Sequence, residues 1–443
     1  MSSEPSLKTR REFLRASALG AATTWTIPSF LAQTFATLQA DAAGPIQSPT
    51  GRDASILVVL QMAGGNDGLN TLVPFANDHY AAARSRLRIS AKEVLKLSEQ
   101  VGLHPDLDGF KSLYDAGHLN IVQGIGYPNP NRSHFRSTEI WHTAADAKKI
   151  EPYGWLGRYF DNACSGCDPT VAINIGGQMP QAFAAKKPAG ICLRNPEDYR
   201  FVTHDHPEPG ELDMTEASYR KLNALEDLAA MDNSGATIGA VSGSTVHSGS
   251  VLDFVERTAL DAQLSSDRIR GISSKVSNHG VYPAGQLAGS LKLVARLIGG
   301  GLPTRLYYVS QGGYDTHSNQ TGAHGRLLKE LGDSMKAFLA DMKAQGNLDR
   351  VVVMTFSEFG RRVRENASGG TDHGAASVMF LAGGKVKAGL SGKYPGLAPS
   401  DLHNGDLQFT TDFRSVYATV LENWLRTPAI PVLGQKFPLL DLV

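Results

Sequence analysis

The sequence has few cysteines and no excess of charge of either sign. It contains three cysteines among 443 residues, and its 43 basic and 43 acidic residues give a formal net charge of zero. Because a chain without excess positive charge has no long-range field that attracts phosphate backbones, we expect no nucleic-acid partner. A local basic patch remains compatible with a small anionic substrate.

The cysteines do not form a pattern typical of a zinc ribbon. Cys164 and Cys167 are separated by two residues, and Cys192 stands apart. A zinc ribbon requires a second pair with similar spacing, which the sequence lacks. In an oxidising compartment the close pair would form a small surface disulfide or remain as thiols.

The sequence also lacks an apolar run long enough to cross a membrane. Arg10 and Arg11 precede a stretch of mostly small and apolar residues that ends near Phe30 and is interrupted by Pro28. This pattern is typical of a twin-arginine signal peptide, although a charged N-terminal helix is the simpler alternative. We expect residues 1–43 to be this signal and the twin-arginine translocase to be a partner. The mature chain would then be periplasmic or secreted, without a transmembrane segment.

Short apolar runs alternate with helical patterns along the remaining chain. Strands are predicted at 55–60, 121–122, 171–175, 305–310, 350–356 and 377–382. Helices are predicted at 77–85, 105–117, 133–141, 211–231, 251–276, 286–299, 326–345 and 412–426. Strands that alternate with helices predict an α/β fold with a parallel sheet, here as a single domain over 44–443.

Several carboxylates and imidazoles follow the predicted strands. Asp315 and His317 come after 305–310, Glu358 comes after 350–356, and His373 lies in a glycine-rich turn. Residues two apart on an extended segment face the same way, so Asp315 and His317 could bind one metal ion, or Asp315 could cap a helix. Carboxylate oxygen and imidazole nitrogen suit zinc or manganese.

Other polar residues permit both a structural and a chemical role. Ser133 is placed to cap a helix or to act as a nucleophile beside Arg132. Glu358 could form an ion pair with Arg361 or Arg362 rather than bind a metal ion. Asp67 could accept hydrogen bonds from the backbone of its turn. The histidines at 204 and 206 are expected on the solvated surface, and His403 could line the site or cap a turn.

Taken together, seven motifs resemble a family of twin-arginine-exported bacterial proteins of the DUF1501 type. They are QMAGGNDGLN at 61–70, RSHF at 132–135, EIWHT at 139–143, GGYDTH at 312–317, SEFGR at 357–361, GTDHG at 370–374 and TDFRSVY at 411–417. That family is similar to the alkaline phosphatase superfamily, which includes sulfatases. The resemblance implies an alkaline-phosphatase-like α/β three-layer sandwich with a mainly parallel central sheet.

The resemblance also implies a metal centre. Asp315, His317 and His373 would form a first divalent-metal site, and Glu358 and Asp67 would contribute to a second. The superfamily commonly has histidine after its second-site aspartate, whereas a phenylalanine follows Glu358 here. This departure affects the second site and leaves the ligands of the first unchanged.

The implied function is hydrolysis of phosphate or related esters. Ser133 would be the nucleophile and Arg132 would stabilise an anion, while a shift of the alignment by one residue would place His134 at the nucleophile position. The alternative is a catalytically degenerate member that binds a ligand or a partner in the envelope.

Overall fold

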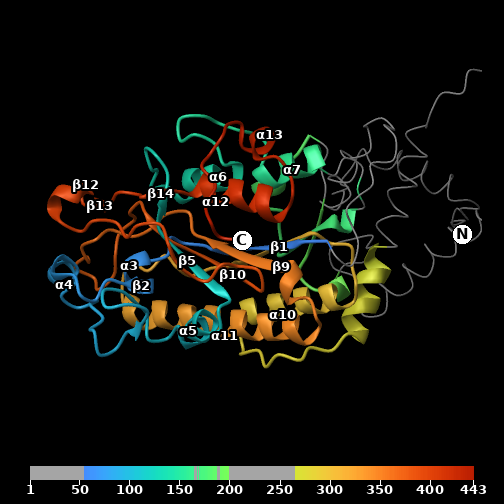
Figure 1. Cartoon of the computed structure of the whole chain (residues 1–443), viewed down its shortest axis with the longest axis horizontal. Helices are drawn as coiled ribbons and strands as arrows, with labels where there is room; N and C mark the ends of the chain where they lie inside the picture. The colour runs from blue at the N-terminus through green and yellow to red at the C-terminus, as the bar shows by residue number, and fades with distance from the viewer. Residues whose placement is uncertain (1–53, 164–166, 168, 187–189, 199–264) are drawn as a thin grey trace, which may run out of the picture. The chain divides into compact units, whose positions relative to one another are not determined.

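The computed structural model describes residues 54–163, 167, 169–186, 190–198 and 265–443 (Figure 1). The predicted signal peptide, the predicted helix 211–231 and the histidines at 204 and 206 lie outside these residues. The helix predicted at 251–276 is described from residue 265, and residues 265–275 are helical.

The chain divides into two compact units. One comprises Met1–Gln39 and Asn195–Arg268, and the other comprises Ala40–Arg194 and Ile269–Val443. The second unit contains all the elements and the site described below. A single domain over 44–443 stays a prediction.

A nine-stranded sheet forms the centre of the second unit. Eight of its strands follow one another across the sheet as β11 (Gly389–Ser391), β5 (Leu119–Gly126), β10 (Ser377–Gly383), β9 (Val351–Phe356), β1 (Ile56–Met62), β8 (Leu306–Gln311), β6 (Ala172–Ile175) and β7 (Ile191–Leu193). The ninth, β14 (Thr411–Asp412), pairs with β5. Only β10 runs antiparallel to its neighbours among these described strands, so the sheet is mixed and mostly parallel.

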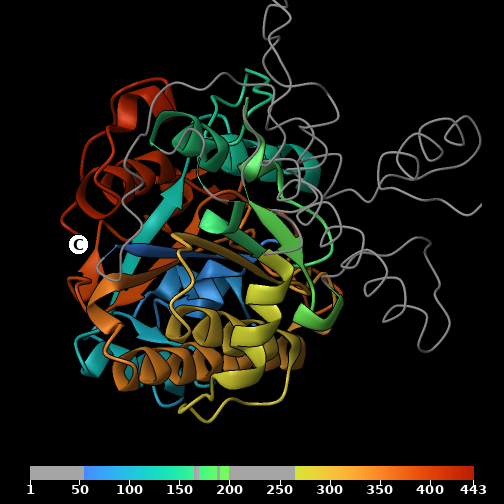
Figure 2. The same cartoon turned by 90° about the vertical axis from the view of Figure 1, so that its right-hand side faces the viewer.

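Helices cover both faces of the sheet, which makes the unit a three-layer α/β fold (Figures 1 and 2). The helices of one face are α5 (Asp108–Asp115), α10 (Gln286–Gly299) and α11 (Gln320–Ala344). The helices of the other are α6 (His134–Thr143), α7 (Trp155–Ala163), α12 (Phe413–Thr419) and α13 (Ala429–Leu433), and a π-helical turn, Val420–Trp424, continues α12. This arrangement confirms the predicted fold class.

Strand β1 is apolar along nearly its whole length because it is buried on both faces. Leu57 and Val59 pack into the core beneath α6, α7 and α12, beside Trp141 and Tyr417. Val58 and Leu60 alternate with them and are also fully buried, as expected where side chains of a central strand point to two covered faces. The hydrophobic effect on both sides thus holds β1 between β8 and β9.

Smaller elements lie around the sheet. Two short helices are α3 (Gly68–Thr71) and α4 (Asp78–Ala83), and the small sheets are β2–β4–β3 (Leu72–Val73, Gly102–Leu103, Leu95–Lys96) and the hairpin β12–β13 (Leu402–His403, Asp406–Leu407). No described helix is both long enough and apolar enough to cross a membrane.

The six predicted strands are all present as β1, β5, β6, β8, β9 and β10. The helix predicted at 326–345 begins earlier, at Gln320, because polar residues occupy its first two turns and hide the apolar periodicity. Cys167 is disulfide-bonded and Cys192 carries a free thiol, while Cys164 lies outside the described residues.

Two of the buried histidines, His142 and His324, bond polar side chains in the interior. His142 bonds the hydroxyl of Tyr308 at 2.9 Å, and His324 bonds Asn66 at 3.0 Å. Burial disfavours the charged imidazolium and lowers the pKa of His142 to about 4 and that of His324 to about 3. Each histidine therefore stays neutral in the folded chain at pH values at which the unfolded chain would bind a proton.

We predict that acid destabilises the fold through these two residues. Because the unfolded state binds more protons between about pH 4 and 6.5, the free energy of unfolding falls as pH is lowered through that range, by up to ~1.4 kcal/mol per pH unit for each histidine. Urea unfolding of the chelator-treated protein at pH 5, 6 and 7 measures this slope. His142→Gln should flatten the slope, whereas exposed His79→Gln should leave it unchanged; equal slopes in all three proteins would contradict the prediction.

Candidate metal centre

The candidate site lies where several loops follow the carboxyl ends of the central strands. Asp315 and His317 follow β8, Glu358 follows β9, and His373 lies between β9 and β10. His134 is the first residue of α6. Ligand sites of parallel sheets gather at this edge, so the topology alone brings residues from distant parts of the sequence together.

Two glycines allow the loops to approach closely. A Cβ atom on Gly64 would lie 2.5 Å from the backbone nitrogen of Asp315, and Gly64 also has a φ of +119°. A Cβ atom on Gly370 would lie 2.3 Å from the carbonyl carbon of His317. Any side chain at these positions would push the loops apart, so both glycines are required for the site.

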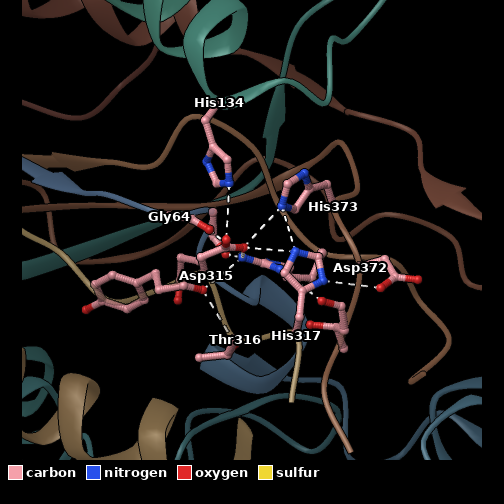
Figure 3. Close-up of polar contacts among 12 residues, drawn as sticks. Gly64, His134, Asp315, Thr316, His317, Asp372 and His373 are labelled. Atoms are coloured by element: carbon pink, nitrogen blue, oxygen red, sulfur yellow. Dashed lines mark hydrogen bonds and ion pairs between the residues drawn. The ribbon is translucent and has the colours of Figure 1, made fainter. Parts of the chain in front are cut away.

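Three imidazoles converge on the carboxylate of Asp315, as Figure 3 shows. Oδ1 of Asp315 lies 3.0 Å from Nε2 of His317 and 3.1 Å from Nε2 of His373, and Oδ2 lies 3.4 Å from Nε2 of His134. The two Nε2 atoms of His317 and His373 are 2.9 Å apart. His134, Asp315 and His373 offer ligand atoms that lie within 4.8 Å of one another, a spacing that could hold one metal ion.

Each imidazole is oriented by an oxygen atom at its other nitrogen. Nδ1 of His134 lies 2.8 Å from Oε1 of Glu358, and Nδ1 of His373 lies 2.8 Å from the carbonyl oxygen of Arg132. Nδ1 of His317 lies 3.3 Å from Oδ1 of Asp372. Carbonyl and carboxylate oxygens accept, so each Nδ1 carries the proton and each Nε2 presents a lone pair to the centre.

This arrangement fits a bound cation. Lone pairs of neutral imidazoles repel one another and the Asp315 carboxylate when they face each other at about 3 Å, and a cation among them turns that repulsion into attraction. Two imidazole nitrogens and one carboxylate, from His134, His373 and Asp315, are a set that zinc takes with a further position open. Oxygen acceptors behind the histidines are a usual feature of such sites. Glu358 thus orients a histidine rather than acting as a ligand in this geometry.

The carboxylate of Asp315 is kept ionised. Burial alone would raise its pKa, but the hydrogen bond and the positive charge of Arg361 outweigh burial and lower the pKa of Asp315 to about 2. Asp315 is also 46% exposed at its side chain, so an incoming ligand can reach the centre from solvent.

Asp67 does not join this group. Its carboxylate forms a buried ion pair with Arg84, whose Nη2 lies 2.9 Å from Oδ1, and it also accepts a hydrogen bond from Gln320. Burial would raise the pKa of Asp67, but the adjacent Arg84 outweighs it and lowers the pKa below its usual value. An internal guanidinium therefore occupies the position beside Asp67 where a second metal ion was expected.

The three residues predicted to be catalytic, Ser133, Arg132 and His134, make different contacts around the metal group. Ser133 is exposed immediately before α6, and its hydroxyl does not cap the helix. Arg132 contributes its carbonyl oxygen to His373, while its guanidinium pairs with Asp406. His134, predicted as an alternative occupant of the nucleophile position, turns its Nε2 atom to the metal group.

The partners of Glu358, Arg361 and Arg362 could not be anticipated from the spacing of residues. The bond between Glu358 and His134 replaces the ion pair with Arg361 or Arg362 that was the simpler alternative. Arg361 instead bonds Asp315 at 2.7 Å, and Arg362 faces Asp406. His403 is exposed on the β12–β13 hairpin, 3.3 Å from the side chain of Asn404.

The chain shows structural similarity to solved proteins of the alkaline phosphatase superfamily. A superfamily protein from Vibrio parahaemolyticus matches with 8% identity and a TM-score of 0.35, covering 94% of this chain and 80% of that one. A sulfatase from Pseudoalteromonas sp. matches with 9% identity and a TM-score of 0.34, covering 92% and 72%. Alkaline phosphatase from the Antarctic bacterium TAB5 matches with 11% identity and a TM-score of 0.29, covering 74% and 92%. All three TM-scores are below 0.5, so no activity is inferred from them.

Sequence comparison matches part of the chain to a family model. A search of curated proteins found no match. Residues 265–432, which include Asp315, His317, Glu358 and His373, match the family model described as "Protein of unknown function (DUF1501)". The match covers the C-terminal part of the chain that carries these four site residues.

Proposed function

We propose that the protein is a hydrolase of phosphate or related esters that depends on one divalent metal ion. The observation that carries the proposal is the convergence of three oriented Nε2 atoms on the carboxylate of Asp315. Nitrogen-rich sets favour zinc over manganese among the metals that suit these ligands. When bound, such a metal supplies a Lewis acid that stabilises negative charge on an ester oxygen.

The chain's own residues complete the proposed site. The first backbone N–H groups of α6 have no acceptor within the helix, and the positive end of the helix dipole favours an anion there. The exposed hydroxyl of Ser133 lies at this end, next to His134. A nucleophile, a metal group and anion-stabilising N–H groups then occupy one edge of the sheet, as ester hydrolysis requires.

One divalent ion per chain is the expected stoichiometry. Asp315→Ala and His373→Ala should lose the metal and the turnover of aryl phosphate and sulfate esters, because each removes a ligand. Elemental analysis after dialysis against zinc, followed by turnover assays, measures both quantities. Glu358→Gln should weaken metal binding by about 10–100-fold, since it removes the carboxylate that orients His134.

Exposed residues provide the matched controls for this experiment. Asp78→Ala and His79→Ala should retain metal and turnover, because both side chains point to solvent on α4. A zinc-loaded wild-type protein that is inert toward every ester, or an Asp315→Ala variant with unchanged metal content, would contradict the proposal.

A second candidate function is binding without catalysis. The uncommitted hydroxyl of Ser133 and the pairing of Asp67 with Arg84 favour a degenerate member that binds a ligand or partner in the envelope. The Ser133→Ala variant distinguishes the two candidate functions. Ser133→Ala should abolish turnover at full metal content in a hydrolase that uses this nucleophile, whereas a binding protein would show no turnover before or after the change.

Asp67→Asn should affect stability rather than metal content. The variant leaves the guanidinium of Arg84 buried without its counter-charge, which costs about 3–5 kcal/mol of unfolding free energy. Urea unfolding measures the loss of stability, and elemental analysis of the same preparation measures the metal content. Asp78→Asn, the same substitution at an exposed position, is the control. A stable Asp67→Asn protein that has lost its zinc would place Asp67 in the metal site.

We also propose that the chain is exported by the twin-arginine translocase to the periplasm. The paired arginines and the modest apolar stretch after them support this location. Replacing Arg10 and Arg11 together by lysine should retain the protein in the cytoplasm, as measured by fractionation and immunoblotting. Arg15→Lys should be exported normally; periplasmic recovery of the double variant would refute the proposal.

A further inference from the structure

Two arginines beside the candidate metal centre share a single buried carboxylate. Nη2 of Arg132 lies 2.5 Å from Oδ2 of Asp406, and Nε of Arg362 lies 3.7 Å from Oδ1. The side chain of Asp406 is 4% exposed, whereas those of Arg132 and Arg362 are 38% and 35% exposed. The carboxylate is thus inside the protein, and both arginine side chains are partly exposed to solvent.

The neighbouring residue Arg361 shows what a purely structural arginine looks like in this protein. Its guanidinium is fully buried and donates to the carbonyl oxygens of Gly64, Gly65, Tyr314 and Thr371 as well as to Asp315. Arg362, one position along the chain, makes only the long contact with Asp406 from its guanidinium among the described residues. Most of its N–H donors therefore remain available.

Both arginines are attached to the metal group through their backbones. The carbonyl oxygen of Arg132 accepts a hydrogen bond from His373, and the backbone N–H of Arg362 donates to the carbonyl oxygen of Asp372 at 2.9 Å. The backbones of Arg132 and Arg362 are therefore both bonded to the segment that carries His373. From these backbone positions, their guanidiniums extend toward Asp406 in the β12–β13 hairpin.

The charges at this position do not balance. Two guanidiniums face one carboxylate, and Asp406 is the only described acidic residue within 4.0 Å of either. Asp372 attracts Arg362 from a distance greater than 4.0 Å, so its compensation is weaker than that of a direct ion pair. The planar N–H groups of both arginines match the oxygens of a carboxylate, phosphate or sulfate. Fastening the hairpin explains the contact of Arg132 with Asp406, but it leaves the exposed donors of Arg362 without a role.

We propose that Arg132 and Arg362 form a second anion-binding position, so that the substrate carries an acidic group in addition to the ester group at the metal centre. This proposal rests on the proposed function and narrows its substrates to esters with at least two anionic groups. Because Asp406 holds the side chain of Arg132 in place before binding, the ordering of this long flexible side chain costs less when the anion arrives.

The test compares two inert probes of similar length. Propylphosphonate carries one anionic group, and 3-phosphonopropionate carries a carboxylate as well. Isothermal titration calorimetry of the zinc-loaded mature chain should give a dissociation constant at least about tenfold lower for 3-phosphonopropionate. Arg362→Gln should remove most of this preference while leaving zinc content and affinity for propylphosphonate unchanged. Arg132→Gln should also remove most of the preference.

Arg364→Gln is the matched control, because Arg364 is exposed two positions from Arg362. It should keep the full preference. Equal affinities for the two probes in the wild-type protein, or a preference that survives both arginine variants, would overturn the second position while leaving the metal hydrolase intact. Failure to bind zinc or either phosphonate would overturn both proposals. Binding of 3-phosphonopropionate alone, lost in Arg362→Gln, would support the arginine position and count against the ester site.

Discussion

The guanidinium of Arg361 connects the three loops on which the candidate metal ligands depend. It bonds the loop after β1 at Gly64 and Gly65, the loop after β8 at Tyr314 and Asp315, and the segment before His373 at Thr371. Carbonyl oxygens buried at the end of a sheet need donors, and one planar cation with five N–H groups satisfies several of them at once. This single residue therefore ties together the loops that carry Asp315, His317 and His373.

Buried cations also decide the charge of the site. Arg361 compensates Asp315, and Arg84 compensates Asp67, so each carboxylate already has a permanent positive partner inside the protein. The two cases differ in what else reaches the carboxylate. Asp67 is enclosed completely, whereas Asp315 keeps its second oxygen turned toward His134 and partly open to solvent. Only one of the two carboxylates can therefore serve an exchangeable ion.

Much of the fold and part of the site could be predicted from the sequence because their signals are local. Continuous apolar runs indicated the central strands, and the spacing of Asp315 and His317 indicated a shared face. The position of Asp67 could not be judged in this way, since its partner Arg84 lies at the end of α4 and its approach depends on tertiary packing. The orientation of His134 by Glu358 was hidden for the same reason, because 224 residues separate the two.

The contribution of Gly64 and Gly370 has a consequence for recognising such centres in other genomes. Neither residue offers a donor atom from a side chain, yet a methyl group at either would collide with the main chain of the strand-end loop that bears Asp315 and His317. A search template built from histidines and aspartates alone would accept chains whose loops cannot close. Templates that give these two achiral positions the same weight as the ligands would select for shape as well as chemistry.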